Sequence, residues 1–412
     1  MNSIRQIGES SLKQLFQQEY SRLVAIISKS FGLQHMQTAE DIVGDTFLQA
    51  AETWGHQGLP PNPVAWLHLV ARQKAIHHFR RKKTFEEKVK PAVQTAADVA
   101  AIPEFSPENI RDSQLQMLFA VCSPLIASEA QIGLALRVLC GFGIEEIAEA
   151  FLVNKETINK RLFRAKEKLR EAQVKLELPP EHEIVNRLDN VLHVIYLLFN
   201  EGYYSRTNNK VLQKDLCLEA MRLALLLTAY EKTNVPKTNA LLALMCFHAS
   251  RFEARVGSDD SIILYDKQDK SLWDDELIKR GNYYLNLAAQ GTEVSAYHLE
   301  ASIAGWHCEK EDSAEKWQQI LNLYNQLLRI NYSPGAALNR VYALYKVAGA
   351  EAAIPEAEQL AFTNTHFYFV LLGELYQHVD KAKAKAHWQQ ALTMAKTKSE
   401  RDIIQQKIAV LD

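Results

Sequence analysis

The sequence has few of the features that mark secreted, membrane-spanning or metal-binding proteins. Its 412 residues include only five cysteines, and no two of them form a C-x-x-C pair. Neither a disulfide framework nor a zinc site is therefore expected. The N-terminus has no apolar run of the signal-peptide kind, and no apolar stretch approaches the roughly 18 residues that a membrane span needs. We expect a cytoplasmic protein with buried thiols and with no metal, cofactor or membrane partner.

An excess of charge of one sign is also lacking, since the formal net charge is −2. The charge of the whole chain therefore gives no argument for binding nucleic acid. Positive charge is nevertheless concentrated in two short stretches, residues 66–90 and 155–175, where Lys and Arg outnumber Asp and Glu. A single basic helix is usually a solvated surface. Two of them, each ending a small bundle, indicate DNA binding.

Strand-like alternation of apolar and polar residues is absent, and nearly every periodic segment has helical spacing. Glycine and proline cluster at junctions such as 59–63 and 178–180. We therefore predict an all-α protein in four parts. These are a small bundle at 1–85, a linker at 86–108, a second small bundle at 109–178 and a larger helical domain at 179–412.

The second bundle follows the pattern of a helix-turn-helix. Ser128 starts a capping-box motif, which predicts that a helix begins there. A short helix over 144–150 and a turn then precede Asn154, a favourable N-cap. Four apolar residues at helical spacing predict one buried stripe on the helix that follows. They are Ile158, Leu162, Ala165 and Leu169.

The N-terminal half of that last helix carries exposed polar side chains. In a helix-turn-helix this half enters the major groove first. Asn and Lys side chains read base edges there, while most Lys and Arg hold phosphates. The predicted DNA-binding residues are Lys155, Asn159, Lys160 and Arg164. A purely structural helical hairpin is the alternative.

The first bundle contains two helices with candidate binding surfaces. The helix over 39–54 buries one side, and its other side carries Asp41, Asp45 and Leu48. A plain solvated surface is the alternative there. The next helix, which starts at 62–63, mixes aromatic and basic residues, and this mixture suits single-stranded DNA because bases stack on rings while cations follow phosphates. Its candidate DNA-binding residues are Trp66, Arg72, Lys74, His77, Arg80 and Arg81. Trp66 belongs to the core in a second interpretation.

These segments resemble a known family. Residues 39–47 resemble the core segment of sigma region 2, and residues 63–81 are similar to its promoter-melting helix. Residues 143–166 are similar to sigma region 4. Over about residues 10–175 the ordered motifs resemble the extracytoplasmic-function (ECF) sigma factors of the sigma-70 family, which keep only these two regions. The resemblance implies a protein that is not an enzyme and that directs core RNA polymerase to promoters.

The resemblance also implies a partner for each group of candidate residues. Asp41, Asp45 and Leu48 would bind the clamp helices of the largest polymerase subunit. The loop at 55–62 and the candidate residues of the melting helix would take the melted −10 strand. The four candidate residues of the recognition helix would meet the −35 element. His77 occupies a position where many relatives have an acidic residue. The exact −10 sequence that this protein prefers therefore does not follow from the resemblance.

The C-terminal part is additional to the two regions that ECF sigma factors keep. A shift of 34 residues aligns Leu338 with Leu372 and Tyr342 with Tyr376, and 34 is the tetratricopeptide (TPR) period. This part is similar to the TPR-like extension of one sigma subgroup. Such repeats form concave protein-binding surfaces. We therefore expect a domain that controls the sigma regions in cis, with an unidentified protein partner.

Two other classes of function stay open on the sequence. The first is a helix-turn-helix regulator that never contacts core polymerase, and the second is a repeat scaffold. The acidic stripe and the aromatic-basic helix argue against the first, because a reader of duplex DNA needs neither. The two basic stretches argue against the second. One interpretation makes Asp266, Asp269, His298 and His307 catalytic residues. The alternative is that Gln268 and Asp269 cap or bridge helices.

Overall fold

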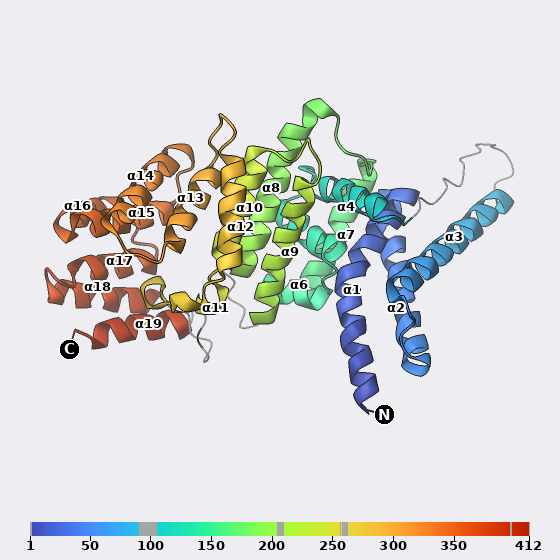
Figure 1. The fold of residues 1–412 in the computed structure, drawn as a ribbon, viewed down its shortest axis with the longest axis horizontal. Helices are drawn as coiled ribbons and strands as arrows, with labels where there is room; N and C mark the ends of the chain where they lie inside the picture. Colours follow the sequence, from blue (N-terminus) through green and yellow to red (C-terminus); the bar gives the residue numbers. More distant parts are fainter. Residues whose placement is uncertain are drawn as a thin grey trace. The chain divides into compact units, whose positions relative to one another are not determined.

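The computed structural model describes residues 2–89, 105–203, 210–255, 257, 263–395 and 398–411 (Figure 1). All regular structure in these ranges is helical, and none of it is a β-strand. The predicted all-α class is confirmed. Contacts divide the chain into two compact units, Met1–Thr233 and Asn234–Asp412, called here the N-terminal and C-terminal units.

The N-terminal unit contains both predicted bundles. Its elements are α1 (Asn2–Phe31), the 3-10 helix η1 (Leu33–His35), α2 (Met36–Gln57), α3 (Pro63–Val89), α4 (Pro107–Val121), α5 (Ser128–Leu134), the π-helical segment η2 (Ala135–Leu139), α6 (Ile144–Ala150), α7 (Lys155–Glu171), α8 (Glu181–Tyr203) and α9 (Lys210–Thr228). Helices α1, α2 and α3 pack on one another, and α1 also contacts α4 and η2. The two sigma-like bundles therefore share one compact unit.

The buried stripes predicted for α2 and α7 are confirmed. Every residue of the α2 stripe is buried, from Ala39 to Trp54. Asn154 caps α7 as predicted, because its side chain accepts a hydrogen bond of 2.8 Å from the backbone N–H of Thr157. The buried residues of α7 are those that the sequence indicates, Ile158, Leu162, Ala165 and Leu169.

The predicted linker at 86–108 lies mostly outside the described residues. On its N-terminal side α3 continues to Val89, beyond the predicted end of the first bundle. On its C-terminal side α4 begins at Pro107, because Ser106 caps it by accepting a hydrogen bond of 3.2 Å from Asn109 N–H. Proline at the first helical position has a backbone angle already suited to a helix.

The capping box predicted at Ser128 is wrong. Ala127 occupies the N-cap position of α5, and no side chain caps that helix. The Gln131 amide instead donates hydrogen bonds to the carbonyls of Ser123 and Ile126, at 3.0 and 2.7 Å. Because Gln131 is held by the preceding turn, its side chain is not available to cap the helix N-terminus.

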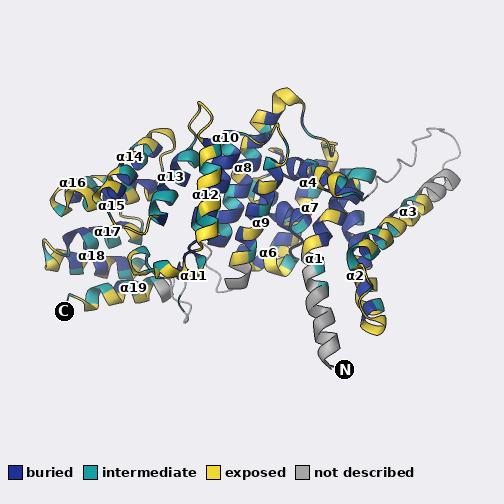
Figure 2. Ribbon diagram, viewed as in Figure 1, coloured by how far each residue is buried: buried dark blue, intermediate teal, exposed yellow. Residues whose placement is uncertain are grey.

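Helices α8 and α9 pack on the second bundle. In the N-terminal unit α8 contacts α4 and α5, while α9 contacts α4 and α6. Arg187 and Asn190 of α8 donate hydrogen bonds to the carbonyls of Phe119 and Cys122, at 2.7 and 2.5 Å. Figure 2 shows much of α8 and α9 in the dark blue of buried residues. By contacts the chain therefore divides after Thr233, and not at residue 179.

The C-terminal unit is a series of helices. Its elements are α10 (Pro236–Ala249), α11 (Phe252–Arg255), η3 (Tyr265–Lys267), η4 (Lys270–Leu272), α12 (Asp275–Ala288), α13 (Ala296–Cys308), α14 (Ala314–Ile330), α15 (Pro334–Ala348), α16 (Ala350–Leu360), α17 (His366–Tyr376), α18 (Lys381–Met394) and α19 (Lys398–Ala409). From α12 to α19 each helix contacts the next. Leu338 of α15 and Leu372 of α17, paired by the 34-residue shift, are both buried. Asp269 caps η4 as predicted, accepting a hydrogen bond of 2.9 Å from Ser271 N–H.

All five cysteines lie in the described part of the chain, and all five are buried without a disulfide. Burial raises the pKa of the thiols of Cys122, Cys140, Cys246 and Cys308. The prediction of buried thiols is confirmed. Among the described helices, none combines the length and the apolar composition needed to cross a bilayer.

Candidate functional site

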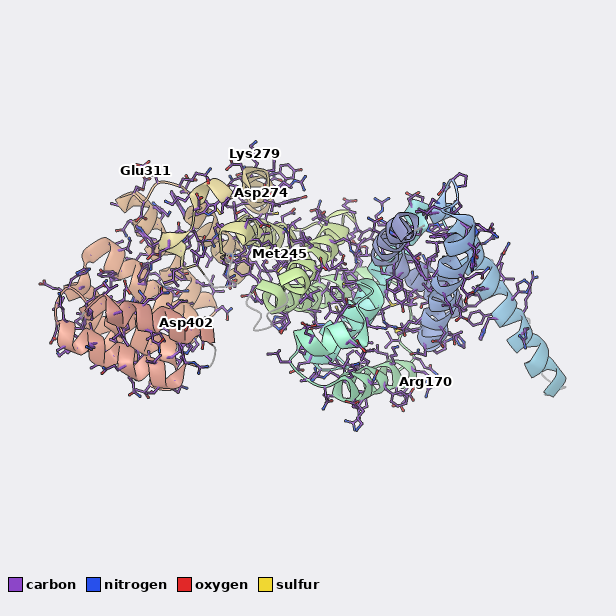
Figure 3. The ribbon with its side chains drawn as sticks, turned by 90° about the horizontal axis from the view of Figure 1, so that it is seen from below. Arg170, Met245, Asp274, Lys279, Glu311 and Asp402 are labelled. Carbon is purple, nitrogen blue, oxygen red and sulfur yellow. The ribbon has the colours of Figure 1, made fainter. Side chains whose placement is uncertain are left out.

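The exposed side of α7 carries all four residues predicted to bind DNA on this helix. Lys155, Asn159, Lys160 and Arg164 are exposed and lie outside the buried stripe. The helix follows α6 through a short turn, so the two form a helix-turn-helix. Figure 3 labels Arg170, which lies in the last turn of α7, at the end opposite these residues.

Lys155 already has a partner on the neighbouring helix. Its ammonium group donates a hydrogen bond to the carboxylate of Glu145 on α6, and this bond lowers the pKa of Glu145. Both side chains are exposed, so the pair contributes little to stability. Lys155 is therefore able to exchange this carboxylate for a phosphate.

One surface residue of α7 was not among the predicted site residues. Phe163 is 65% exposed and lies next to Arg164 on the outer side of the helix. Its position outside the buried stripe is the signal in the sequence that indicates exposure. An aromatic ring beside basic residues gives this surface an apolar contact in addition to its charges.

Four of the predicted residues on α3 are exposed: Arg72, His77, Arg80 and Arg81. Figure 2 shows the coloured part of α3 mostly in the colours of exposed and intermediate residues. Lys74 differs, because it is half-buried and its ammonium group donates a hydrogen bond of 2.8 Å to the backbone carbonyl of Asp45 on α2. In this structure Lys74 joins α3 to α2.

Trp66 combines the two interpretations that the sequence leaves open. It is half-buried, and its ring packs edge-on against Trp54 of α2, with 5.3 Å between the ring centroids. Part of the indole therefore belongs to the packing between α2 and α3. The remaining part stays accessible beside the basic residues of α3.

The acidic stripe predicted on α2 is on the surface. Asp41 and Asp45 are exposed, and Leu48 is 60% exposed on the same side of the helix. Asp41 accepts one exposed hydrogen bond of 3.2 Å from Gln37. This surface therefore offers two carboxylates and an apolar side chain to a partner.

A buried carboxylate joins α2 to the second bundle. Glu40 is only 3% exposed, and one of its oxygens accepts a hydrogen bond of 3.0 Å from Arg137 Nε in η2. Its other oxygen accepts a hydrogen bond from Lys166 of α7, which also donates to Gln37 at 2.8 Å. A cavity of about 310 Å³ adjoins this contact, and Asn159 and Phe163 are among its lining residues. Lys166 is thus paired with Glu40 and does not face solvent as a phosphate contact would.

The contact of Glu40 with Arg137 and Lys166 is expected to stabilise the N-terminal unit. The two cations are only 25% and 19% exposed, so Glu40→Gln leaves them largely buried without a counter-charge. We expect a loss of about 3 kcal/mol in the free energy of unfolding, the lower end for a broken buried pair. Urea unfolding of the variant measures this loss. Glu52→Gln is the matched control because Glu52 is exposed on the same helix, and equal midpoints for the two variants would contradict the expectation.

Comparison with known proteins identifies the two bundles. Residues 15–85 match sigma-70 region 2, and residues 132–169 match sigma-70 region 4. Residues 187–289 match a family of unknown function, DUF6596, and this match extends across the division between the two units.

One relative matches along most of the chain. An uncharacterized protein of Rhizobium meliloti (strain 1021) is 30% identical over 384 residues, which cover 91% of this chain and 90% of that protein. No solved structure matches. The region 2 match contains the acidic stripe of α2 and the basic side of α3, and the region 4 match contains the exposed row of α7. The chain therefore belongs to the sigma-70 family of RNA polymerase sigma factors.

Proposed function

We propose that this chain is an ECF-type sigma factor that acts in the cytoplasm and reads both promoter elements with its own helices. As a sigma-70 family member it binds core RNA polymerase and promoter DNA. The proposal concerns its type and the residues that make these contacts. The observation that carries it is the exposed row of Lys155, Asn159, Lys160 and Arg164 on the N-terminal half of a capped second helix.

In this proposal α7 contacts the −35 element. The Asn159 amide has a donor and an acceptor, which is the pattern that matches the major-groove edge of adenine, while Lys160 suits guanine. Lys155 and Arg164 lie on either side of them and hold phosphates, which position the helix without reading sequence. Their cationic groups make this part of the affinity dependent on salt.

The −10 strand lies along α3. Arg72, His77, Arg80 and Arg81 are exposed along this helix, so their side chains follow the phosphates of a single strand. The accessible part of Trp66 provides a ring on which a base stacks. Lys74, which is bonded to the Asp45 carbonyl, contributes by fixing α3 against α2.

The acidic stripe of α2 binds core polymerase. Asp41 and Asp45 attract a basic surface, and Leu48 adds apolar contact at the same place. Because Lys74 and Trp66 fasten α3 to α2, polymerase binding through α2 also sets the position of α3. The polymerase and the melted strand therefore meet two sides of one rigid helix pair.

The C-terminal unit regulates these regions in cis, and its helix pairs are of the TPR type. The 34-residue shift, the successive contacts from α12 to α19 and the burial of Leu338 and Leu372 support this part of the proposal. A concave surface of such repeats suits a protein partner. Regulation works either by covering the DNA-binding helices or by holding them in an active arrangement.

Transcription from a promoter library with purified core polymerase, with and without this protein, tests the proposed function. The protein is expected to select a subset of promoters that share both upstream and downstream sequence elements. An unchanged transcript profile would contradict the proposal. Promoters that share only an upstream element would contradict the role assigned to α3.

Single substitutions on α7 test direct reading of the −35 element. Asn159→Ala and Lys160→Ala are each expected to cost about 1–3 kcal/mol of binding and to relax the preference at one or two base pairs. Lys168→Ala, which changes an exposed residue further along α7, should weaken binding equally on all sequences. Binding to a randomised −35 element at fixed salt measures the three profiles. If they coincide, Asn159 and Lys160 hold phosphates instead.

A further inference from the structure

Four side chains of the C-terminal unit meet around that of Tyr265. The Tyr265 hydroxyl donates a hydrogen bond of 2.8 Å to the backbone carbonyl of His307 on α13 and accepts one of 2.8 Å from Lys316 of α14. The guanidinium of Arg251, which follows α10, lies 5.4 Å from the Tyr265 ring. The Trp273 ring lies 6.2 Å away. We call these residues, Arg251, Tyr265, Trp273, His307 and Lys316, the Arg251 cluster.

Two cations of the Arg251 cluster are buried without a carboxylate partner. Arg251 is 8% exposed and Lys316 is 1% exposed. Lys316 bonds only neutral oxygens, those of Tyr265 and of the Glu309 backbone at 2.8 Å each. Within the described part of the chain neither residue forms an ion pair, although buried charges in proteins are normally paired. The nearby carboxylate of Asp312 instead bonds Trp317 and Lys346.

The cluster also contains buried nitrogen atoms without hydrogen-bond partners among the described residues. They are Arg251 Nε, Trp273 Nε1 and His307 Nδ1. Each buried group left unbonded costs about 1–3 kcal/mol. Arg251 and Trp273 belong to segments that are joined by a backbone hydrogen bond of 2.8 Å, from Asp274 N–H to the Ser250 carbonyl. Figure 3 labels Asp274, the residue that follows Trp273.

The charge of the cluster is set by Arg251 and Lys316. Burial and the charges of these two residues lower the pKa of His307 to about 3, so its imidazole is neutral at physiological pH. Burial also lowers the pKa of Lys316. The neighbouring Asp312 carboxylate acts in the opposite direction on both groups.

We propose that the Arg251 cluster binds a small anion that carries a phosphate group. A phosphate monoester has a charge of about −1.5 to −2 at pH 7, which balances two cations, and its three oxygens are strong acceptors. Arginine matches phosphate geometry, and its Nε together with Trp273 Nε1 supplies donors that now lack an acceptor. A monocarboxylate leaves one cation uncompensated, and a water molecule leaves both. This site is independent of the function proposed above.

The wall of the cluster offers a path of access. Tyr265 and Trp273 belong to the segment 263–274, which contains two single-turn 3-10 helices, η3 and η4, and is otherwise irregular. Among the described residues, its interior backbone hydrogen bonds are local, and only Ile263 and Asp274 at its ends bond the backbone outside it. A segment held in this way opens locally at a lower cost in free energy than a packed helix. Transient displacement of this segment admits a ligand to the two cations, and its return places Trp273 beside the ligand.

Calorimetric titration of the full chain with inorganic phosphate, at millimolar concentrations where general salting effects are small, tests the proposal. Saturable binding at one site is expected. Trp273→Phe keeps a ring and removes one donor, so it should weaken binding about tenfold or more. Trp388→Phe is the control, because Trp388 is equally buried and its indole donates to the Val370 carbonyl.

A second variant separates binding from folding. Lys316→Met removes a buried charge at similar volume, so the ligand-free protein should be as stable as the wild type or more stable, while phosphate binding is lost. Titration with glycerol 3-phosphate distinguishes the two sources of the phosphate group. Tighter binding of glycerol 3-phosphate than of inorganic phosphate indicates a phosphorylated metabolite. Binding of inorganic phosphate that is equal or tighter indicates free phosphate. The absence of saturable binding for both probes overturns the proposal. So does binding that Trp273→Phe and Lys316→Met leave unchanged.

Discussion

The double substitution Asp41→Arg with Asp45→Arg is expected to abolish co-purification of the chain with core RNA polymerase. Both carboxylates are exposed, and among the described residues the Asp41 carboxylate accepts a single hydrogen bond, a surface bond from Gln37. The fold should therefore be unchanged, since surface pairs contribute little to stability. At the interface two attractive charges become two repulsive ones, and like charges brought together cost several kcal/mol.

The matched control is Glu108→Arg with Asp112→Arg. These two residues lie on α4 with the same spacing of four positions, and both are exposed. The control variant should co-purify with core polymerase as the wild type does, and circular dichroism should show the same helix content for both variants. Wild-type recovery of core polymerase by the Asp41/Asp45 variant would show that α2 does not carry the docking surface.

A chain that ends after Pro180 is expected to lose the fold of region 4, whereas one that ends after Thr233 should keep it. Helices α8 and α9 cover α4, α5 and α6. Buried side chains such as Leu188, Leu192 and Ile195 of α8 each contribute about 1.5–3 kcal/mol when removed from water. Their sum rivals the 5–15 kcal/mol that keeps a whole domain folded.

Urea unfolding of the two truncated chains measures this difference. The longer chain should unfold cooperatively, and the shorter one should show a weak transition or aggregate. Equal transitions would contradict a structural role for α8 and α9. The longer chain then serves to test regulation, because its transcription is compared with that of the full chain without loss of region 4. Higher activity of the truncated chain indicates that the C-terminal unit covers the DNA-binding helices. Lower activity indicates that it holds them in an active arrangement. Equal output with equal induction rules out both.

Local patterns in the sequence predict much of this fold. The α2 and α7 stripes, the Asn154 cap and the exposure of Asp41 follow from helical periodicity and from the hydrogen-bonding capacity of one side chain. These features depend on residues within one or two helical turns of each other. The exposed sides of α2, α3 and α7 were predictable for the same reason.

Features that depend on distant residues were not predictable. Glu40 and Lys166 are separated by 126 positions. A charged residue beside a buried stripe is predicted to lie on the surface unless its distant partner is known. The amphipathic pattern of α8 predicts that one side is buried, but not that this side packs on α4 and α5. At Ser128 the motif was satisfied in sequence, yet contacts of Gln131 with the preceding turn prevented the cap.

The burial of the five cysteines limits how this protein responds to oxidants. Thiolate is the form that peroxide and disulfides attack, and burial holds Cys122, Cys140, Cys246 and Cys308 in the thiol form. Oxidation of these side chains therefore requires prior unfolding of the helices that cover them. Polymerase assays with and without a reducing agent should give the same output, and a transcriptional response to peroxide would have to reach this sigma factor through another molecule.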